Sequence, residues 1–149
     1  MTHKLAIIGL GIMGRRMLEN ALQHPAFEVS GVWDPCAASV AKMQETLPCA
    51  PLADSAEQAM QGADVVYLAC PPGPRKAYAL QACAAGQGVF MEKPLGTDNA
   101  ESRDLLQQLQ RARLPSVVNF TQAASRVGLR PCKRPLMRGK QESCWASTS

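Results

Sequence analysis

Residues 9–14 read GLGIMG, and this glycine motif constrains the fold more than any other stretch of the chain. A short apolar run at residues 4–8 precedes it, and apolar residues at helical spacing follow it over residues 12–24. The order predicts a strand, a tight glycine turn and a helix. In such a turn the first glycine permits the bend, the second lets the backbone approach a pyrophosphate, and the third allows close helix packing. The motif therefore predicts a parallel-sheet unit with an anion site at the helix N-terminus.

The rest of the chain repeats the alternation of strand and helix. Strands are expected at residues 4–8, 27–33, 50–52, 63–69, 88–92 and 116–120, and helices at 12–24, 37–47, 55–61, 75–85 and 97–113. Ser55 and Thr97 are the expected N-caps of the third and fifth helices. Six alternating strands predict an α/β fold with a doubly wound parallel sheet, the Rossmann order 3-2-1-4-5-6, and helices on both faces.

An acidic residue in the expected position supports dinucleotide binding. Asp34 ends the second predicted strand, 20 residues after Gly14. There it would accept hydrogen bonds from the adenosine ribose, and its charge would repel a 2′-phosphate, which favours NAD over NADP. The alternative is an aspartate that caps the next helix, and this role does not exclude contact with the ribose. A strand-to-helix connection without a ligand remains the alternative for the whole glycine motif.

Composition and charge exclude several classes of protein. The chain is 46% hydrophobic, but it has no apolar run long enough to cross a bilayer, so a cytoplasmic location is expected. Its six cysteines form no C-x-x-C pair, and it has only two histidines, so neither a metal site nor a disulfide framework is predicted. Residues 1–123 hold 10 Lys and Arg against 11 Asp and Glu, whereas residues 124–149 hold 6 against 1. The net charge of +4 therefore belongs to the C-terminal segment.

A Lys-Pro step follows the fifth predicted strand, within the sequence FMEKPLG. Glu92, Lys93 and Pro94 lie at a strand's carboxyl end, the edge of an open α/β sheet where ligands bind. Proline restricts the backbone after the lysine, and the bond between them can be cis, so the ammonium group can be held in one direction. We expect Lys93 to face the nicotinamide half of the cofactor. The alternative is a solvated surface lysine.

Taken together, GLGIMG, Asp34, ACPP after the fourth strand and MEKPLG after the fifth resemble the Gfo/Idh/MocA family of NAD(P)-dependent oxidoreductases. The resemblance runs from about residue 4 to residue 122 and covers the N-terminal Rossmann domain of that family. It implies hydride transfer between nicotinamide and a carbon that bears a hydroxyl, often on a sugar or cyclitol. It also implies a second α/β domain that forms the substrate site and the oligomer interface.

The resemblance assigns roles to individual residues. It implies that the pyrophosphate contacts Gly9, Gly11, Ile12, Met13 and Gly14, and that the ribose contacts Asp34. It implies that Cys70, Pro71 and Pro72 form a loop along the dinucleotide. It also implies that Glu92 and Lys93, supported by Pro94, are the motif pair near the nicotinamide and the substrate. Lys93 is the expected catalytic group, because its charge would polarise the reacting oxygen. Family members often have histidine a few residues after the paired prolines, where this chain has Arg75.

After about residue 122 the periodic patterns stop. We expect a dinucleotide-binding domain over residues 1–122 and an irregular basic segment, without a second domain, over residues 123–149. The hypothesis is a truncated family member that is catalytically incomplete, with a tail that reads like translation in a shifted frame. The alternative is a non-catalytic NAD-binding module that acts with a partner. Without interleaved aromatic residues or an amphipathic helix, the basic segment predicts neither nucleic-acid nor membrane binding. Self-association is expected if an apolar surface is left uncovered.

Overall fold

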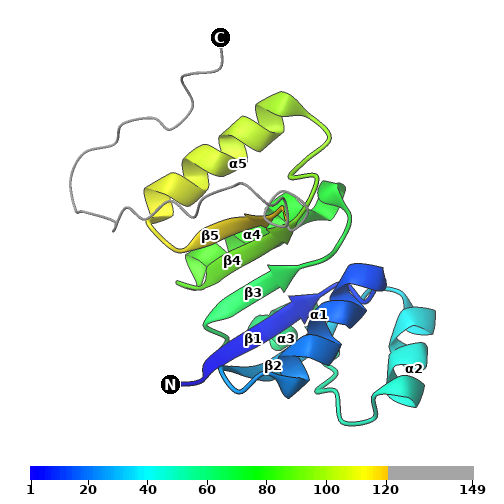
Figure 1. The fold of residues 1–149 in the computed structure, drawn as a ribbon. Helices are drawn as coiled ribbons and strands as arrows, with labels where there is room; N and C mark the ends of the chain where they lie inside the picture. The colour runs from blue at the N-terminus through cyan, green and yellow to red at the C-terminus, as the bar shows by residue number, and fades with distance from the viewer. Residues whose placement is uncertain (121–149) are drawn as a thin grey trace, which may run out of the picture.

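The computed structural model describes residues 1–120, which form a parallel five-stranded sheet in the order β2-β1-β3-β4-β5 (Figure 1). The strands are β1 (His3–Ile8), β2 (Phe27–Trp33), β3 (Val65–Leu68), β4 (Gly88–Glu92) and β5 (Ser116–Asn119). Every pairing between neighbouring strands is parallel. The chain leaves β1 toward β2 on one side and returns to β3 on the other. The predicted α/β class is therefore confirmed, and the order reverses between β1 and β3.

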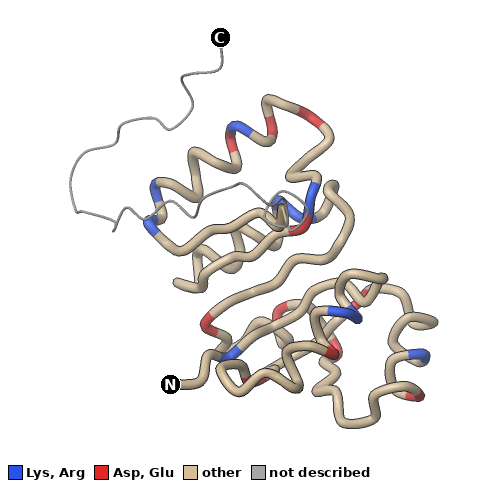
Figure 2. Tube along the Cα trace, in the orientation of Figure 1, with Lys and Arg blue, Asp and Glu red and all other residues tan. Residues whose placement is uncertain are grey.

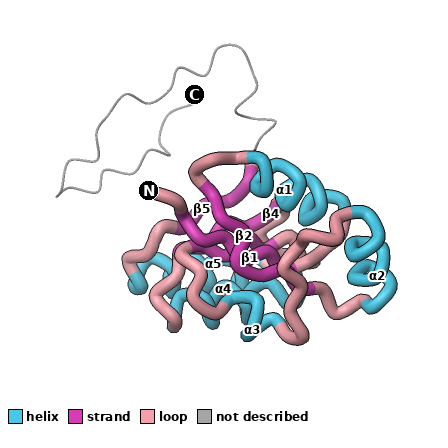
Figure 3. Tube along the Cα trace, turned by 90° about the horizontal axis from the view of Figure 1, so that it is seen from below, coloured by secondary structure: helices cyan, strands magenta, loops and turns pink. Residues whose placement is uncertain are grey.

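Within residues 1–120, five helices cover the two faces of this sheet. They are α1 (Ile12–Gln23), α2 (Ala37–Thr46), α3 (Ala56–Met60), α4 (Pro72–Ala84) and α5 (Asn99–Ala112). Figure 3 shows α1 and α2 on one face and α3, α4 and α5 on the other. Alternate residues of the central strands supply the two cores: Ile8 and Leu68 pack with the second group of helices, while Ile7 and Tyr67 pack with the first. Because β1 and β3 are covered on both faces, they read as continuous apolar runs in the sequence.

The prediction of a strand at residues 50–52 was wrong. Residues 50–52 form a single bridge between Leu52 and Val32. The carbonyl of Pro51 accepts from Val32 N at 2.9 Å, and Ala53 N donates to the carbonyl of Val32 at 2.9 Å. Pro51 has no N–H and cannot extend a ladder, so this segment contributes one pairing at the edge of β2. The sheet thus has the predicted strand order, except that the strand predicted at residues 50–52 is absent.

Two helix starts also differ from the predictions. Thr97 is not the N-cap of α5; Asp98 is, and its carboxylate accepts from Glu101 N at 2.8 Å. The fourth helix begins at Pro72 instead of near residue 75, because the fixed φ of proline suits the first helical turn, where its missing N–H is not needed. Ser55 caps α3 as predicted and accepts from Gln58 N at 3.1 Å.

Acidic and basic residues are interspersed along the described elements, as Figure 2 shows. None of the helices within residues 1–120 has the length and apolar character needed to span a membrane. The predictions for residues 123–149, an irregular basic segment and the absence of a second domain, fall outside the described residues.

Candidate functional site

A cavity of about 570 Å³ opens at the carboxyl ends of β1, β2, β3 and β4, beside the point where the strand order reverses. It is lined by Gly9, Gly11, Met13, Trp33, Asp34, Pro35, Ser39, Ala69, Cys70, Pro71, Pro72, Pro74, Arg75, Tyr78, Glu92 and Lys93. The topology therefore brings most of the predicted site residues to one place. The exceptions are Ile12, whose side chain is exposed, Gly14, which is buried beneath the turn, and Pro94.

The glycine turn is built as tightly as its sequence predicts. Gly9 has φ +101°, and a Cβ placed there would lie 2.7 Å from the backbone nitrogen of Cys70. A Cβ on Gly14 would lie 1.8 Å from the carbonyl oxygen of Gly9, so only glycine lets α1 sit this close to the end of β1. Gly11 differs from both, because a Cβ there would meet no atom within 4 Å. Its bare backbone faces open space at the cavity.

The N-terminus of α1 offers donors to an anion at the same place. Gly11 is the N-cap, has no side chain to satisfy the first turn, and accepts from Arg15 N at 3.0 Å. The amides of Ile12, Met13 and Gly14 therefore have no partner within the helix. Free amides beside an uncovered backbone fit the pyrophosphate of a dinucleotide.

Asp34 joins the glycine turn to the loop that follows β2. One carboxylate oxygen accepts from Leu10 N at 2.6 Å, and the other accepts from Cys36 N at 2.8 Å. Asp34 is not the cap of α2, since Cys36 occupies the N-cap position. Each carboxylate oxygen keeps a further lone pair that can accept a hydrogen bond from a ribose hydroxyl. The acidic residue thus holds the turn and still fits the predicted ligand.

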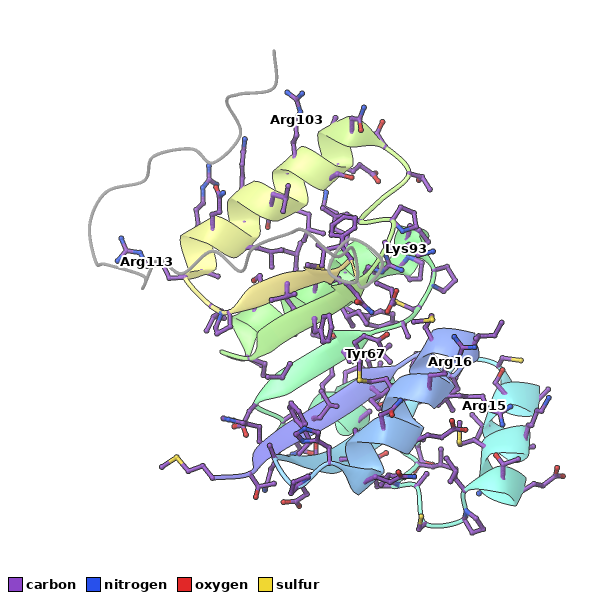
Figure 4. The ribbon with its side chains drawn as sticks, in the orientation of Figure 1. Arg15, Arg16, Tyr67, Lys93, Arg103 and Arg113 are labelled. Atoms are coloured by element: carbon purple, nitrogen blue, oxygen red, sulfur yellow. The ribbon has the colours of Figure 1, made fainter. Side chains whose placement is uncertain are left out.

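Lys93 is exposed on the loop after β4, at the same end of the sheet as the start of α1 (Figure 4). Its peptide bond to Pro94 is cis. Within residues 1–120 the lysine forms no ion pair, so its ammonium group is available at the cavity.

Glu92, the other half of the motif pair, points its carboxylate into the protein and is 4% exposed. Its Oε1 accepts from the Tyr67 hydroxyl and from Asn119 Nδ2, the latter at 2.5 Å. Burial, together with the hydrogen bond to Glu92, raises the pKa of Tyr67 well above its ordinary value. The carboxylate thus joins β3, β4 and β5 at the edge of the site. Sequence reasoning did not identify Tyr67 or Asn119, because their contact with Glu92 is made across strands far apart in the chain.

Arg75, whose role the sequence left open, is buried beneath the cavity and is 2% exposed. Its Nη2 donates to the carbonyl of Cys70 at 2.5 Å, and its Nη1 donates to the carbonyls of Glu92, at 2.5 Å, and Pro94. The loops after β3 and β4 are therefore bonded to one guanidinium. Cys70 itself is buried, and burial raises the pKa of its thiol although the cation of Arg75 opposes the shift.

Two aromatic side chains that line the cavity were also not predicted from the sequence. Trp33 and Tyr78 meet edge to face, with ring centroids 6.0 Å apart. Trp33 ends β2 and Tyr78 lies in α4, so the sequence contains no local signal that they meet. Together they form an aromatic side of the cavity.

A family model described as "Oxidoreductase family, NAD-binding Rossmann fold" matches residues 3–120. The chain belongs to the Gfo/Idh/MocA oxidoreductase family. The predicted resemblance is confirmed, and the described residues are the NAD-binding Rossmann domain of this family.

Solved structures give the same result for this Gfo/Idh/MocA domain. An NAD-binding protein from Listeria innocua is 25% identical with a TM-score of 0.70, and the alignment covers 80% of this chain and 35% of that one. The apo scyllo-inositol dehydrogenase from Lactobacillus casei is 25% identical with a TM-score of 0.71, covering 81% and 37%. A myo-inositol 2-dehydrogenase from Lactobacillus plantarum, 19% identical with a TM-score of 0.74, covers 83% and 38% and supports the fold alone.

The aligned part of this Gfo/Idh/MocA chain thus spans little more than a third of these proteins. No curated protein matches the chain.

Proposed function

We propose that this chain binds NAD(H) across the cavity at the carboxyl edge of its sheet. The observation that carries this proposal is the convergence of the Gly9–Gly14 turn, Asp34, Cys70 to Pro72 and Lys93 on one cavity. The pyrophosphate would lie on the amides of Ile12 and Met13 and against the backbone of Gly11, which no Cβ obstructs.

The preference for NAD over NADP rests on Asp34. Its carboxylate is fixed by two backbone donors, so it would meet the adenosine ribose with a negative charge held in place. A 2′-phosphate at that ribose would be repelled by this charge. Among the residues that line the cavity, the basic side chains are Arg75 and Lys93, and Arg75 is occupied by three carbonyl groups.

Lys93 is the proposed catalytic residue. When bound, the nicotinamide supplies the hydride chemistry. Beside it, the Lys93 ammonium group would donate a hydrogen bond to the reacting oxygen and stabilise the negative charge that develops there. A carbon bearing a hydroxyl on a sugar or cyclitol is the proposed substrate class, and the scyllo-inositol dehydrogenase among the similar structures supports it.

Proton transfer through a histidine or an accessible carboxylate would need a group from outside the described residues. The cavity is lined by no histidine from residues 1–120; of its two carboxylates, that of Asp34 lies in the loop after β2 and that of Glu92 is turned inward toward Tyr67 and Asn119. General acid–base catalysis requires a group within hydrogen-bond reach of the proton. We therefore propose that residues 1–120 bind the dinucleotide but do not complete the reaction. The same observation favours the second candidate, a non-catalytic NAD-binding module that acts with a partner.

We also propose that the chain self-associates through an apolar face. On the side of the sheet that carries α1, a groove of about 370 Å³ runs beside strands β3 to β5 and is lined by residues such as Met17, Phe90 and Val117. Of the residues that line it, Val117 is 56% exposed and Phe27 is 38% exposed. An apolar surface of this kind favours contact with a second copy.

Calorimetric titration with NADH and NADPH, with Asp34→Arg in parallel, tests the cofactor proposal. The natural chain should bind NADH more tightly than NADPH, and the variant should reverse the order, because an arginine can pair with the 2′-phosphate. A thermal melt of the variant is needed, since Asp34 also accepts from Leu10 N. Absence of binding by the folded natural chain would refute the proposal.

A further inference from the structure

Arg75 is a buried cation, and within residues 1–120 all of its hydrogen bonds go to backbone carbonyls. Its guanidinium reaches Cys70 O at the end of β3, and Glu92 O and Pro94 O on either side of Lys93. Its Nε has no partner among the described residues, and no carboxylate within residues 1–120 forms an ion pair with it. Burying a charge costs free energy unless hydrogen bonds compensate for the lost hydration. The hydrogen bonds of Arg75 should therefore account for an arginine at this position.

The two acceptors around Lys93 indicate that reason. Glu92 and Pro94 are the residues immediately before and after the lysine, and both carbonyls bond to the same Nη1 atom. The third acceptor, Cys70 O, precedes Pro71 and Pro72 in the loop along the cavity. One planar group thus holds the backbone on both sides of Lys93 at a set distance from the neighbouring loop. The exposed side chain of Lys93 is directed by this backbone.

Arginine suits this task better than the alternatives. Its nitrogens form a rigid fork that is charged at all accessible pH values, whereas lysine donates from one atom and histidine donates from both ring nitrogens only when protonated. An uncharged amide such as glutamine is shorter and has two donors on one atom, so it does not match the three carbonyls that accept from Nη1 and Nη2.

We propose that Arg75 is a positioning residue that orients Lys93 toward the nicotinamide half of the bound dinucleotide. This inference rests on the proposed binding of NAD(H). Removal of Arg75 should therefore weaken only the part of the affinity that comes from the nicotinamide half. The adenosine half, held by the Gly9–Gly14 turn and Asp34, should bind as before.

Comparing NADH with ADP-ribose separates the two halves, because ADP-ribose has the pyrophosphate and adenosine but no nicotinamide. Calorimetric dissociation constants of both ligands would be measured for the natural chain, Arg75→Gln, Lys93→Met and the double variant. We expect NADH to bind about 3- to 10-fold more weakly to either single variant. This loss is the equivalent of one hydrogen bond from Lys93 to the nicotinamide half, so the double variant should show no further loss. ADP-ribose should bind all four proteins equally. Arg103→Gln, at an exposed site on α5, is the matched control and should change neither constant.

The outcomes are distinguishable. If NADH and ADP-ribose weaken together in a folded Arg75→Gln variant, or if the two substitutions are additive, Arg75 does not act through Lys93 and the inference is overturned. Equal affinities of the natural chain for the two ligands would overturn it as well. If ADP-ribose does not bind the natural chain, the proposed function fails before Arg75 is considered. Should thermal melts show that Arg75→Gln is unfolded, Arg75→Lys keeps the charge but not the fork, and the same pattern of constants is expected for it.

Discussion

Substituting alanine for either Gly14 or Gly11 separates the two functions of the glycine turn. In Gly14→Ala the new Cβ would lie 1.8 Å from the carbonyl oxygen of Gly9, where ordinary contact begins at 3.4 Å, so α1 and the turn must separate by about 1.6 Å. The obstructing atoms are backbone, and Leu18 and Ala21 of α1 are core residues that would move with the helix. In Gly11→Ala the Cβ would meet nothing within 4 Å, and φ is already −63°.

The expected magnitudes follow from these contacts. Overpacking a core costs about 1–3 kcal/mol and reaches or exceeds the upper end when backbone opposes it, while alanine recovers up to about 1 kcal/mol of helix propensity. We expect a net loss of about 2 kcal/mol or more for Gly14→Ala, or roughly 8 °C in Tm for a domain of this size. Gly11→Ala should change Tm by no more than about 2 °C, yet weaken NADH binding about tenfold or more by placing a methyl group where the pyrophosphate approaches.

Differential scanning fluorimetry followed by titration with NADH measures both quantities on the same proteins. Equal changes in Tm for the two variants would refute the packing role assigned to Gly14. A Gly11→Ala variant that binds NADH as tightly as the natural chain would refute the placement of the pyrophosphate.

Two further predictions concern pH and assembly. Because the pKa of Tyr67 is raised in the folded state, the unfolded chain loses this proton first, near pH 10, and the free energy of unfolding should fall by about 1.4 kcal/mol per pH unit above that point. Urea denaturation between pH 9 and 11 should show a shallower decline for Tyr67→Phe; parallel declines would contradict the assignment. Sedimentation velocity should show self-association that Val117→Lys reduces, whereas a concentration-independent monomer of the natural chain would argue against an interface on the β5 side of the groove.

The parts that could be predicted have local causes. The Gly9–Gly14 turn, the helices and most strands follow from spacing, capping and glycine geometry within a few residues. The incorrect predictions lie where two adjacent residues can both serve as an N-cap, or where pairing with a neighbouring strand determines whether a strand forms. Pro51 lacks the N–H that would extend a ladder beyond the single bridge of residues 50–52, and Asp98 caps α5 in place of Thr97 because the helix begins one residue later. The extent of a strand depends on its neighbour in the sheet, which the sequence does not show directly.

By itself, the sequence determined the α/β class, the position of the glycine turn and the acidic residue after β2, because chain connectivity and backbone chemistry require them. Only the tertiary structure decided that Glu92 turns inward to Tyr67 and Asn119, and that Arg75 is bonded to the backbone on both sides of Lys93. The physical reason is that these contacts join loops and strands 17 to 27 residues apart, so they exist only once the sheet is assembled. The burial of a polar side chain is a property of that assembly and has no signature in the local sequence.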